Sequence, residues 1–106
     1  MNIGDEILEG TELKYAIEIS SPGFQITRDN FEIDLHCGEN RLHFNKSELP
    51  FGDDGKYYLC FDSSLLGPGN VTAIITAHVP DNLFSDHYRD EITSFHLTKI
   101  RKRPVK

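Results

Sequence analysis

Tryptophan is absent from this chain of 106 residues, methionine occurs once, and there are only two cysteines. Two cysteines are too few for a disulfide scaffold, and Cys37 and Cys60 both stand in alternating apolar segments, so we expect reduced, buried thiols. Long hydrophobic runs are also missing. The longest lies near residues 73–77 and is already interrupted by Thr76, which excludes a bilayer-spanning helix. The first six residues lack the basic start and apolar stretch of a signal peptide, so we expect a chain that is cytoplasmic when synthesised, unless a signal has been removed.

Basic side chains are scarce before residue 99. The chain has 17 acidic and 11 basic residues and a net charge of −6. Five of the basic residues lie in the last eight positions, which leaves six against 17 acidic residues in the body. An acidic body repels phosphates, so specific nucleic-acid binding is not expected. The basic tail, residues 101–106, is either a solvated charge run or a contact for an acidic surface in an assembly. The candidate contact residues of this basic region are Lys99, which lies in the last expected strand, and Arg101, Lys102 and Arg103, which lie in the tail.

Length and composition indicate one soluble domain that covers residues 1–106. Hydrophobic residues make up 38% of the chain and charged residues 26%, as in ordinary globular proteins. A chain of this size buries enough surface to fold without a metal or a disulfide. Disorder is therefore not expected.

Alternation of apolar and polar residues with a period of two is the dominant pattern, and it indicates half-buried strands. Strands are expected at residues 13–19, 31–37, 41–45, 56–61, 70–79 and 92–100. Residues 38–40 are expected to form a three-residue hairpin loop, and residues 62–67 a single helical turn. The 70–79 strand is expected to be the longest and central, and the last strand to carry Phe95 and Leu97 on one face and His96 and Thr98 on the other.

Many short strands separated by turn signals predict an all-β fold. The expected architecture is a single-domain β-sandwich of six to eight antiparallel strands, Ig-like or Greek-key in its connections. A short stretch, Asp54 through Tyr58 to Cys60, resembles the Asp-x-x-x-Tyr-x-Cys sequence of immunoglobulin domains. The interval from Cys37 to Cys60 is too short for the disulfide that joins the two sheets of immunoglobulin domains. We therefore interpret the resemblance as a local pattern that β-sandwiches share, in which an Asp in a turn is followed by a Tyr that points inward.

Catalytic constellations are not visible in the sequence. There is no nucleophile elbow, and neither cysteine has a recognisable base. The five histidines lack metal-ligand spacing, and most lie on strand positions opposite the apolar set. We therefore expect no catalytic residue, no metal site and no cofactor.

The segment from Pro80 to Glu91 has the composition of a contact loop, because Leu83, Phe84 and Tyr88 lie close together among carboxylates. Its candidate binding residues are Asp81, Phe84, Asp86, Tyr88 and Arg89. Two of these have a structural interpretation beside the functional one. Arg89 is expected to tie the loop down through nearby carboxylates or carbonyls, and Phe84 either packs under the loop or faces a partner.

A longer pattern resembles a known group of proteins. Residues 55–59 and 61–69, followed by Val79-Pro80-Asp81, Phe84, Asp86, Arg89 and Glu91-Ile92, are similar to small β-sandwich proteins encoded in phage and prophage tail and fibre gene clusters of gut Bacteroidetes. In outline they are also similar to the N-terminal domain of siphophage baseplate upper proteins. The resemblance implies a non-enzymatic structural or adaptor protein that is associated with a virion and acts through protein–protein contacts, with a protein partner or by self-association. The alternative is a carbohydrate-binding or adhesion module with an aromatic platform drawn from Tyr57, Tyr58, Phe84 and Tyr88.

Overall fold

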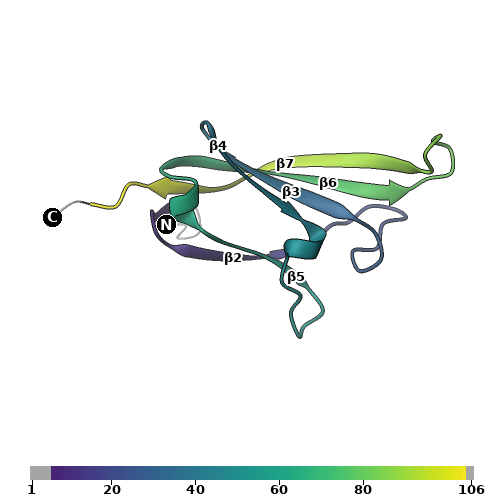
Figure 1. Ribbon diagram of the computed structural model, residues 1–106, viewed down its shortest axis with the longest axis horizontal. Coiled ribbons are helices and arrows are strands. Elements are labelled where there is room, and N and C mark those ends of the chain that lie inside the picture. Colours follow the sequence, from purple (N-terminus) through teal and green to yellow (C-terminus); the bar gives the residue numbers. More distant parts are fainter. Residues whose placement is uncertain (1–5, 105–106) are drawn as a thin grey trace.

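The computed structural model describes residues 6–104, and almost all of its regular structure is strand. Figure 1 shows two layers of strands with a long hairpin at one end. The basic tail is described as far as Pro104, and its last two residues lie outside the described part of the chain. The elements, in chain order, are β1 (Glu6–Leu8), β2 (Glu12–Ile17), β3 (Phe31–Cys37), β4 (Asn40–Asn45), the 3-10 turn η1 (Lys46–Glu48), β5 (Tyr57–Asp62), the 3-10 turn η2 (Ser63–Leu65), β6 (Gly69–Pro80) and β7 (Tyr88–Arg101).

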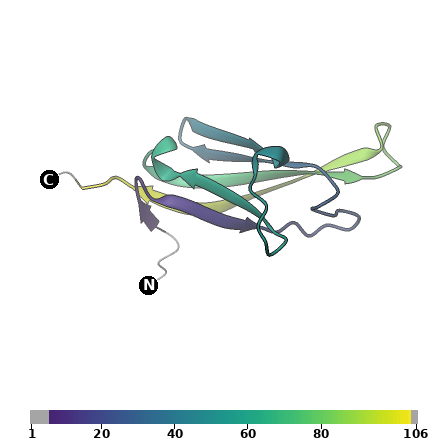
Figure 2. The same ribbon diagram turned by 60° about the horizontal axis from the view of Figure 1, so that its bottom comes forward.

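The two layers are unequal in size. Five strands form one sheet in the order β1-β7-β6-β3-β4, and β2 and β5 form the other. The view in Figure 2 shows the β2 layer covering only part of the larger sheet, with the end of the β6–β7 hairpin beyond it. All pairings are antiparallel except that of β1 with β7, which is parallel, so the expectation of an entirely antiparallel sandwich was wrong at this one edge. The predicted all-β sandwich is otherwise confirmed, and its strand order corresponds to the G-F-C-C′ and B-E strands of immunoglobulin-type sandwiches.

Local sequence explains most of the strand boundaries. The β3–β4 hairpin has a two-residue turn rather than the expected three-residue loop, because Cys37 pairs with Asn40. Gly38, the first turn residue, has φ = 60°, the sign that a type II′ hairpin turn requires there. The expected turn after β5 is confirmed as η2. The Asp62 carboxylate caps it by accepting a hydrogen bond of 2.8 Å from the backbone N–H of Ser64.

The core lies between the two layers and follows the predicted alternation. Phe31, Ile33 and Leu35 project from β3 and are at most 1% exposed. Val71, Ala73, Ala77 and Val79 continue this surface on β6. Leu59 and Phe61 of β5 face them from the second layer, together with Ile17 of β2.

The last strand departs from the prediction at Leu97. β6 is central as expected, but β7, with 14 residues, is longer than β6, with 12. The register of these strands pairs Thr72 with His96 and Val71 with Thr98, which leaves Leu97 as the extra residue of a β-bulge. Because the bulge reverses the alternation, Thr98 turns inward with Ile100 and is completely buried, contrary to its predicted outward position.

The two cysteines have different environments. Cys37 is buried as predicted, with its Sγ 3.5 Å from the carbonyl oxygen of Gly67, and burial raises its pKa. Cys60 is a free, exposed thiol, so its predicted burial was wrong. Leu59 and Phe61 take the inward positions of β5, which places Cys60 and Tyr58 on the outward side. The expectation of an inward Tyr58 was therefore also wrong, and its hydroxyl instead donates a hydrogen bond to Asp54.

Candidate functional site: the tip of the β6–β7 hairpin

The predicted contact loop is shorter than its sequence suggested. β6 continues to Pro80 and β7 begins at Tyr88, and these two residues pair with one another. Only residues 81–87 connect the strands, while Arg89 and Glu91 belong to β7. This segment is the tip of a hairpin that projects from the body of the sandwich (Figure 1).

Hydrogen bonds within the tip hold its backbone in one conformation. The N–H of Asp81 donates to the carbonyl of His87 at 2.8 Å, and the N–H of His87 donates to the carbonyl of Phe84 at 2.9 Å. The carboxylates of Asp81 and Asp86 accept bonds of 3.0 and 3.2 Å from the N–H groups of Leu83 and Tyr88. His87 has φ = 67°, in the left-handed region. The tip is thus a built turn and not a loose connection.

Arg89 ties this tip to the rest of the molecule. Its Nε lies 3.0 Å from Asp81 Oδ2, its Nη1 lies 2.6 Å from Glu91 Oε1, and its Nη2 donates to the carbonyl of Pro22 at 3.1 Å. The three contacts use three directions of the planar guanidinium, a geometry that a lysine cannot reproduce. The structural role expected for Arg89 is therefore present in its contacts.

Apolar side chains cover the outside of the tip. Leu83 is 94% exposed, and Phe84 and Tyr88 are each 49% exposed. Phe84 is therefore not packed under the loop as a core residue. Beside Tyr88 is an open recess of about 550 Å³, lined by Arg28, Asp29, Asn30, His78, Asp86, Tyr88 and Asp90. A rigid apolar group next to acidic side chains is an arrangement suited to a protein contact.

The four aromatic residues considered for a sugar platform do not come together. Tyr57 lies in the second layer and packs edge-on against Phe31 and Phe51, at centroid distances of 5.8 and 4.7 Å. Tyr58 has the ammonium group of Lys14 over its ring. Phe84 lies in the tip and Tyr88 is the first residue of β7 next to it, at the end of the other sheet.

The candidate residues of the basic tail lie at the opposite end of β7 from the tip. Lys99 and Arg101 are exposed on β7 itself, next to β1, and Lys102 and Arg103 follow the strand and are also exposed. Arg101 Nη1 lies 3.4 Å from Glu6 Oε1, in a pair whose side chains are 63% and 49% exposed. Such exposed pairs contribute little to stability, so these cations remain accessible for other contacts.

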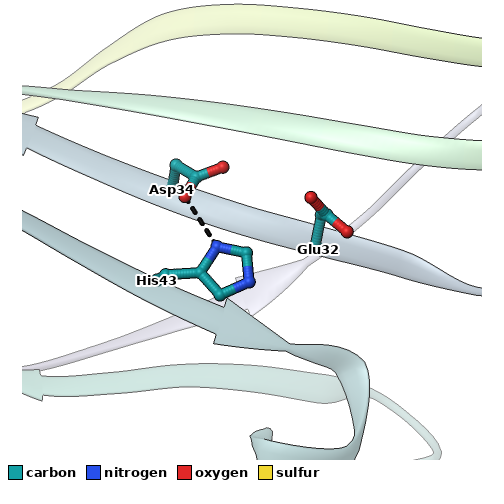
Figure 3. Close-up of side chains that lie close together, drawn as sticks. All are labelled: Glu32, Asp34 and His43. Atoms are coloured by element: carbon teal, nitrogen blue, oxygen red, sulfur yellow. Dashed lines mark hydrogen bonds and ion pairs between the residues drawn. The ribbon is translucent and has the colours of Figure 1, made fainter.

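Imidazole and carboxylate groups gather on the outer face of the larger sheet. On β3 and β4, His43 Nδ1 lies 2.7 Å from Asp34 Oδ1, and its Nε2 lies 3.1 Å from Asn45 Oδ1. Figure 3 shows His43 and Asp34 joined in this way, with Glu32 one position along the same face. Glu32 in turn lies 3.5 Å from His78 Nε2 on β6.

These pairs change the protonation of two histidines. The carboxylate of Asp34, and then Asn45, raise the pKa of His43 above its usual value. For His78, partial burial lowers the pKa, but hydrogen bonds to Asp90 at 2.6 Å and to Glu32 together raise it. Both histidines therefore form ion pairs with these carboxylates when their imidazoles are protonated, and their contribution to the stability of the fold depends on pH.

One group on this face has the donor types of a metal site. Atoms of Glu32, Asp34 and His43 lie within 4.8 Å of one another. Two carboxylates and an imidazole are a donor set that divalent cations accept. Both ring nitrogens of His43 already have hydrogen-bond partners, so ion pairing and hydrogen bonding account for the arrangement.

Sequence reasoning missed this outer-face network, although its signal was present. Glu32 and Asp34 are two residues apart on one strand. His43 and Asn45 are likewise two residues apart on the next strand. The period of two places each pair on one face. The pairing of Asp34 with His43 depends on the hairpin register, which the expected three-residue loop would have shifted.

An apolar groove that the sequence did not indicate lies between the layers. It has a volume of about 340 Å³ and runs beside β2, over the inner face of the larger sheet, where Ile75, Phe95 and Leu97 line it. Phe95 is 42% exposed there, because the two-stranded layer ends before it covers β7.

Comparison of the chain with protein-family models, curated proteins and solved structures gave no match. Within residues 6–104, no helix has the length and apolar character needed to cross a bilayer. The function therefore has to be inferred from the arrangement of residues described above.

Proposed function

We propose that this protein is a non-enzymatic structural or adaptor protein that acts through protein–protein contacts, as a component associated with a phage or prophage tail or fibre. The observation that carries the proposal is the tip of the β6–β7 hairpin. There, an almost fully exposed leucine and a half-exposed phenylalanine lie on a turn that is fixed by hydrogen bonds and by Arg89, and the half-exposed Tyr88 follows at the start of β7.

The rigidity of the tip supports a contact role. Holding apolar side chains in water lowers solubility, and a rigid turn gives them little chance to turn inward. When such groups are already in their bound positions, association costs less conformational entropy. Leu83 and Phe84 would form the apolar centre of the contact, and Asp81 and Asp86 its polar margin.

The tail and fibre assignment rests on the sequence pattern of residues 55–92. In the structure this pattern runs from β5 through η2 and β6 to the tip and the first residues of β7. Glycines with positive φ lie at two of its chain reversals: Gly55 before β5, and Gly67 and Gly69 between η2 and β6. The same residues that carry the resemblance therefore build the hairpin and present its tip.

The proposal is tested by binding of the purified protein to the products of the genes that flank its own. Leu83→Ser should weaken a tip-mediated complex by about 1–3 kcal/mol, as for a contact residue at the centre of an interface. Leu65→Ser is the matched control, since Leu65 is also an exposed leucine, at 61%, but belongs to η2. Equal effects of the two substitutions, or no effect of either, would contradict the proposal.

The carbohydrate-binding alternative is separated by a glycan array. A sugar site at the tip would lose glycan binding with Tyr88→Ala or Phe84→Ala and keep every protein contact. A protein-contact tip should show no glycan dependence and lose its protein partner with Phe84→Ala.

A further inference from the structure

Among residues 6–104, no strand pairs with most of the side of β7 that faces away from β6. β1 pairs with β7 only at Lys99, Ile100 and Arg101. From Tyr88 to Thr98, no described strand lies beside β7 on the side away from β6. An unpaired edge presents a row of backbone N–H and C=O groups that another strand can bind.

Three features distinguish this edge from a protected one. Residues 92–96 are exposed at five consecutive positions, so both faces of the strand as well as its edge meet solvent. The exposed side chains include Ile92 at 67% and Phe95 at 42%. From residue 92 to residue 96 there is no Lys, Arg, Asp, Glu or proline, the residues by which proteins usually block an edge, and the β-bulge at Leu97 lies beyond this stretch. The opposite edge strand, β4, has six residues and carries the exposed Arg41.

We infer that two copies of this chain associate through the free edges of their β7 strands, in antiparallel orientation, with Thr93 facing its counterpart in the second copy. The inference concerns self-association and does not depend on what the hairpin tip binds. In the dimer, the larger sheets of the two copies join into one continuous sheet, in which β7 is no longer an edge strand.

The register follows from the length of the open edge. Thr93 is the midpoint of the unpaired segment from Tyr88 to Thr98, and a two-fold axis at Thr93 pairs residues 90–96 of the two copies, clear of the bulge at Leu97 and of β1 of either copy. A shift by two residues in one direction would leave part of the edge unpaired, and in the other it would place Tyr88 opposite Ile100, where β1 of the second copy already occupies the edge. Directly opposed threonines are also a favourable cross-strand pair.

Charge at the two ends of β7 fits the same orientation. In an antiparallel pair, the hairpin tip of one copy lies beside the C-terminal end of the other. The tip carries Asp86 and Asp81, the second already paired with Arg89, while the far end of β7 and the residues after it carry the exposed cations Lys99, Arg101, Lys102 and Arg103 beside one carboxylate of β1, Glu6. Within the strand, Asp90 comes to lie opposite His96 of the second copy. Opposite charges at both ends favour this orientation over a parallel one.

The mass of the protein in solution tests the inference. Light scattering after size exclusion should give twice the chain mass of 12.1 kDa for the wild type. Thr93→Lys places two ammonium groups directly opposite each other and should shift the mass to that of one chain. A mixture of the Thr93→Lys and Thr93→Glu proteins should restore the double mass, because opposite charges then meet at the axis. Thr27→Lys, the same change at an exposed loop position, should leave the dimer intact.

Disulfide trapping tests the register without relying on repulsion. In a Cys60→Ser background, which removes the exposed native thiol, Thr93→Cys should form a covalent dimer rapidly under mild oxidation. Ile92→Cys, whose counterpart is offset by two positions, should cross-link much more slowly. A wild-type protein that stays at 12.1 kDa at all concentrations would overturn the inference, and so would faster cross-linking at residue 92 than at residue 93.

Discussion

Replacing Arg89 by alanine removes the tie between the hairpin tip and the body of the sandwich. The substitution deletes three contacts, to Asp81, to Glu91 and to the Pro22 carbonyl. It also leaves the Asp81 carboxylate, which is 23% exposed, without its cationic partner. The tip should therefore open more easily, and the folded state should lose stability even though no core residue has changed.

The size of the effect follows from how well water can replace each contact. Arg89 and Asp81 are both about three-quarters buried, so their charged hydrogen bond should contribute about 1–2 kcal/mol after partial solvation. The pair with Glu91, which is 42% exposed, should contribute about 0.5 kcal/mol, and the bond to the Pro22 carbonyl a similar amount. Because these contacts share one side chain and are not additive, we expect a loss of about 2 kcal/mol.

Urea unfolding monitored by tyrosine fluorescence and circular dichroism measures this loss. With a slope of about 2 kcal/mol per molar urea, the midpoint should fall by about 1 M. Arg89→Lys keeps the charge but not the forked geometry and should lie between the alanine variant and the wild type. Arg41→Ala is the control for removal of an exposed arginine. A loss below about 0.5 kcal/mol for Arg89→Ala, the range of ordinary surface changes, would refute the assignment of Arg89 as a tie.

Three further outcomes can be measured on the same protein. A thiol reagent should label Cys60 in the native protein and Cys37 only after unfolding, because only Cys60 is exposed. Labelling of both cysteines in the native protein, or of neither, would contradict the structure. For His78, the raised pKa means that its ion pairs stabilise the fold fully below pH 6.5, its usual value, and that this stabilisation is lost as the pH rises through the folded pKa. The stability difference between wild type and His78→Gln in urea should therefore be larger at pH 5.5 than at pH 8.5, with His36→Gln as the control for removing an imidazole from this face. Ser63→Ala should cost about 1–2 kcal/mol in urea unfolding, because the buried hydroxyl accepts the Gly10 N–H at 2.9 Å, and an unchanged midpoint would show that water replaces this bond.

The sequence was sufficient to predict the strands that are buried on one face. In β3, the alternation from Phe31 to Cys37 gives the strand its observed boundaries, because every second residue enters the core. The capped turn at Asp62 was predictable for a similar reason, since the capping residue and its target are neighbours in sequence. Local chemistry and local pattern agree at both places.

The errors occurred where a long-range pairing decides the outcome. Cys60 and Leu59 are both apolar, and only the packing of β5 on the larger sheet determines which of them turns inward. The bulge at Leu97 likewise depends on the partner strand, because nothing in the sequence around it marks an extra residue. At the hairpin tip, the apolar and acidic residues were recognisable, but pairing of Pro80 with Tyr88 made most of the expected loop into strand. The outer-face network was missed because its members come from four different strands.

The parallel pairing of β1 with β7 has a mechanical consequence. Glu6 lies beside Lys99 and Leu8 beside Arg101, so the two strands run in the same direction at one end of the molecule. A pulling force applied to the chain before Glu6 and after Arg101 acts along these strands in opposite directions. It therefore loads the hydrogen bonds between them in shear, all at once, and cannot open them one by one. Under tension, the rate of unfolding determines how long a protein stays folded. The pairing of β1 with β7 slows that rate, because its hydrogen bonds must break together. The long β6–β7 hairpin does not bear the force until this pairing has broken.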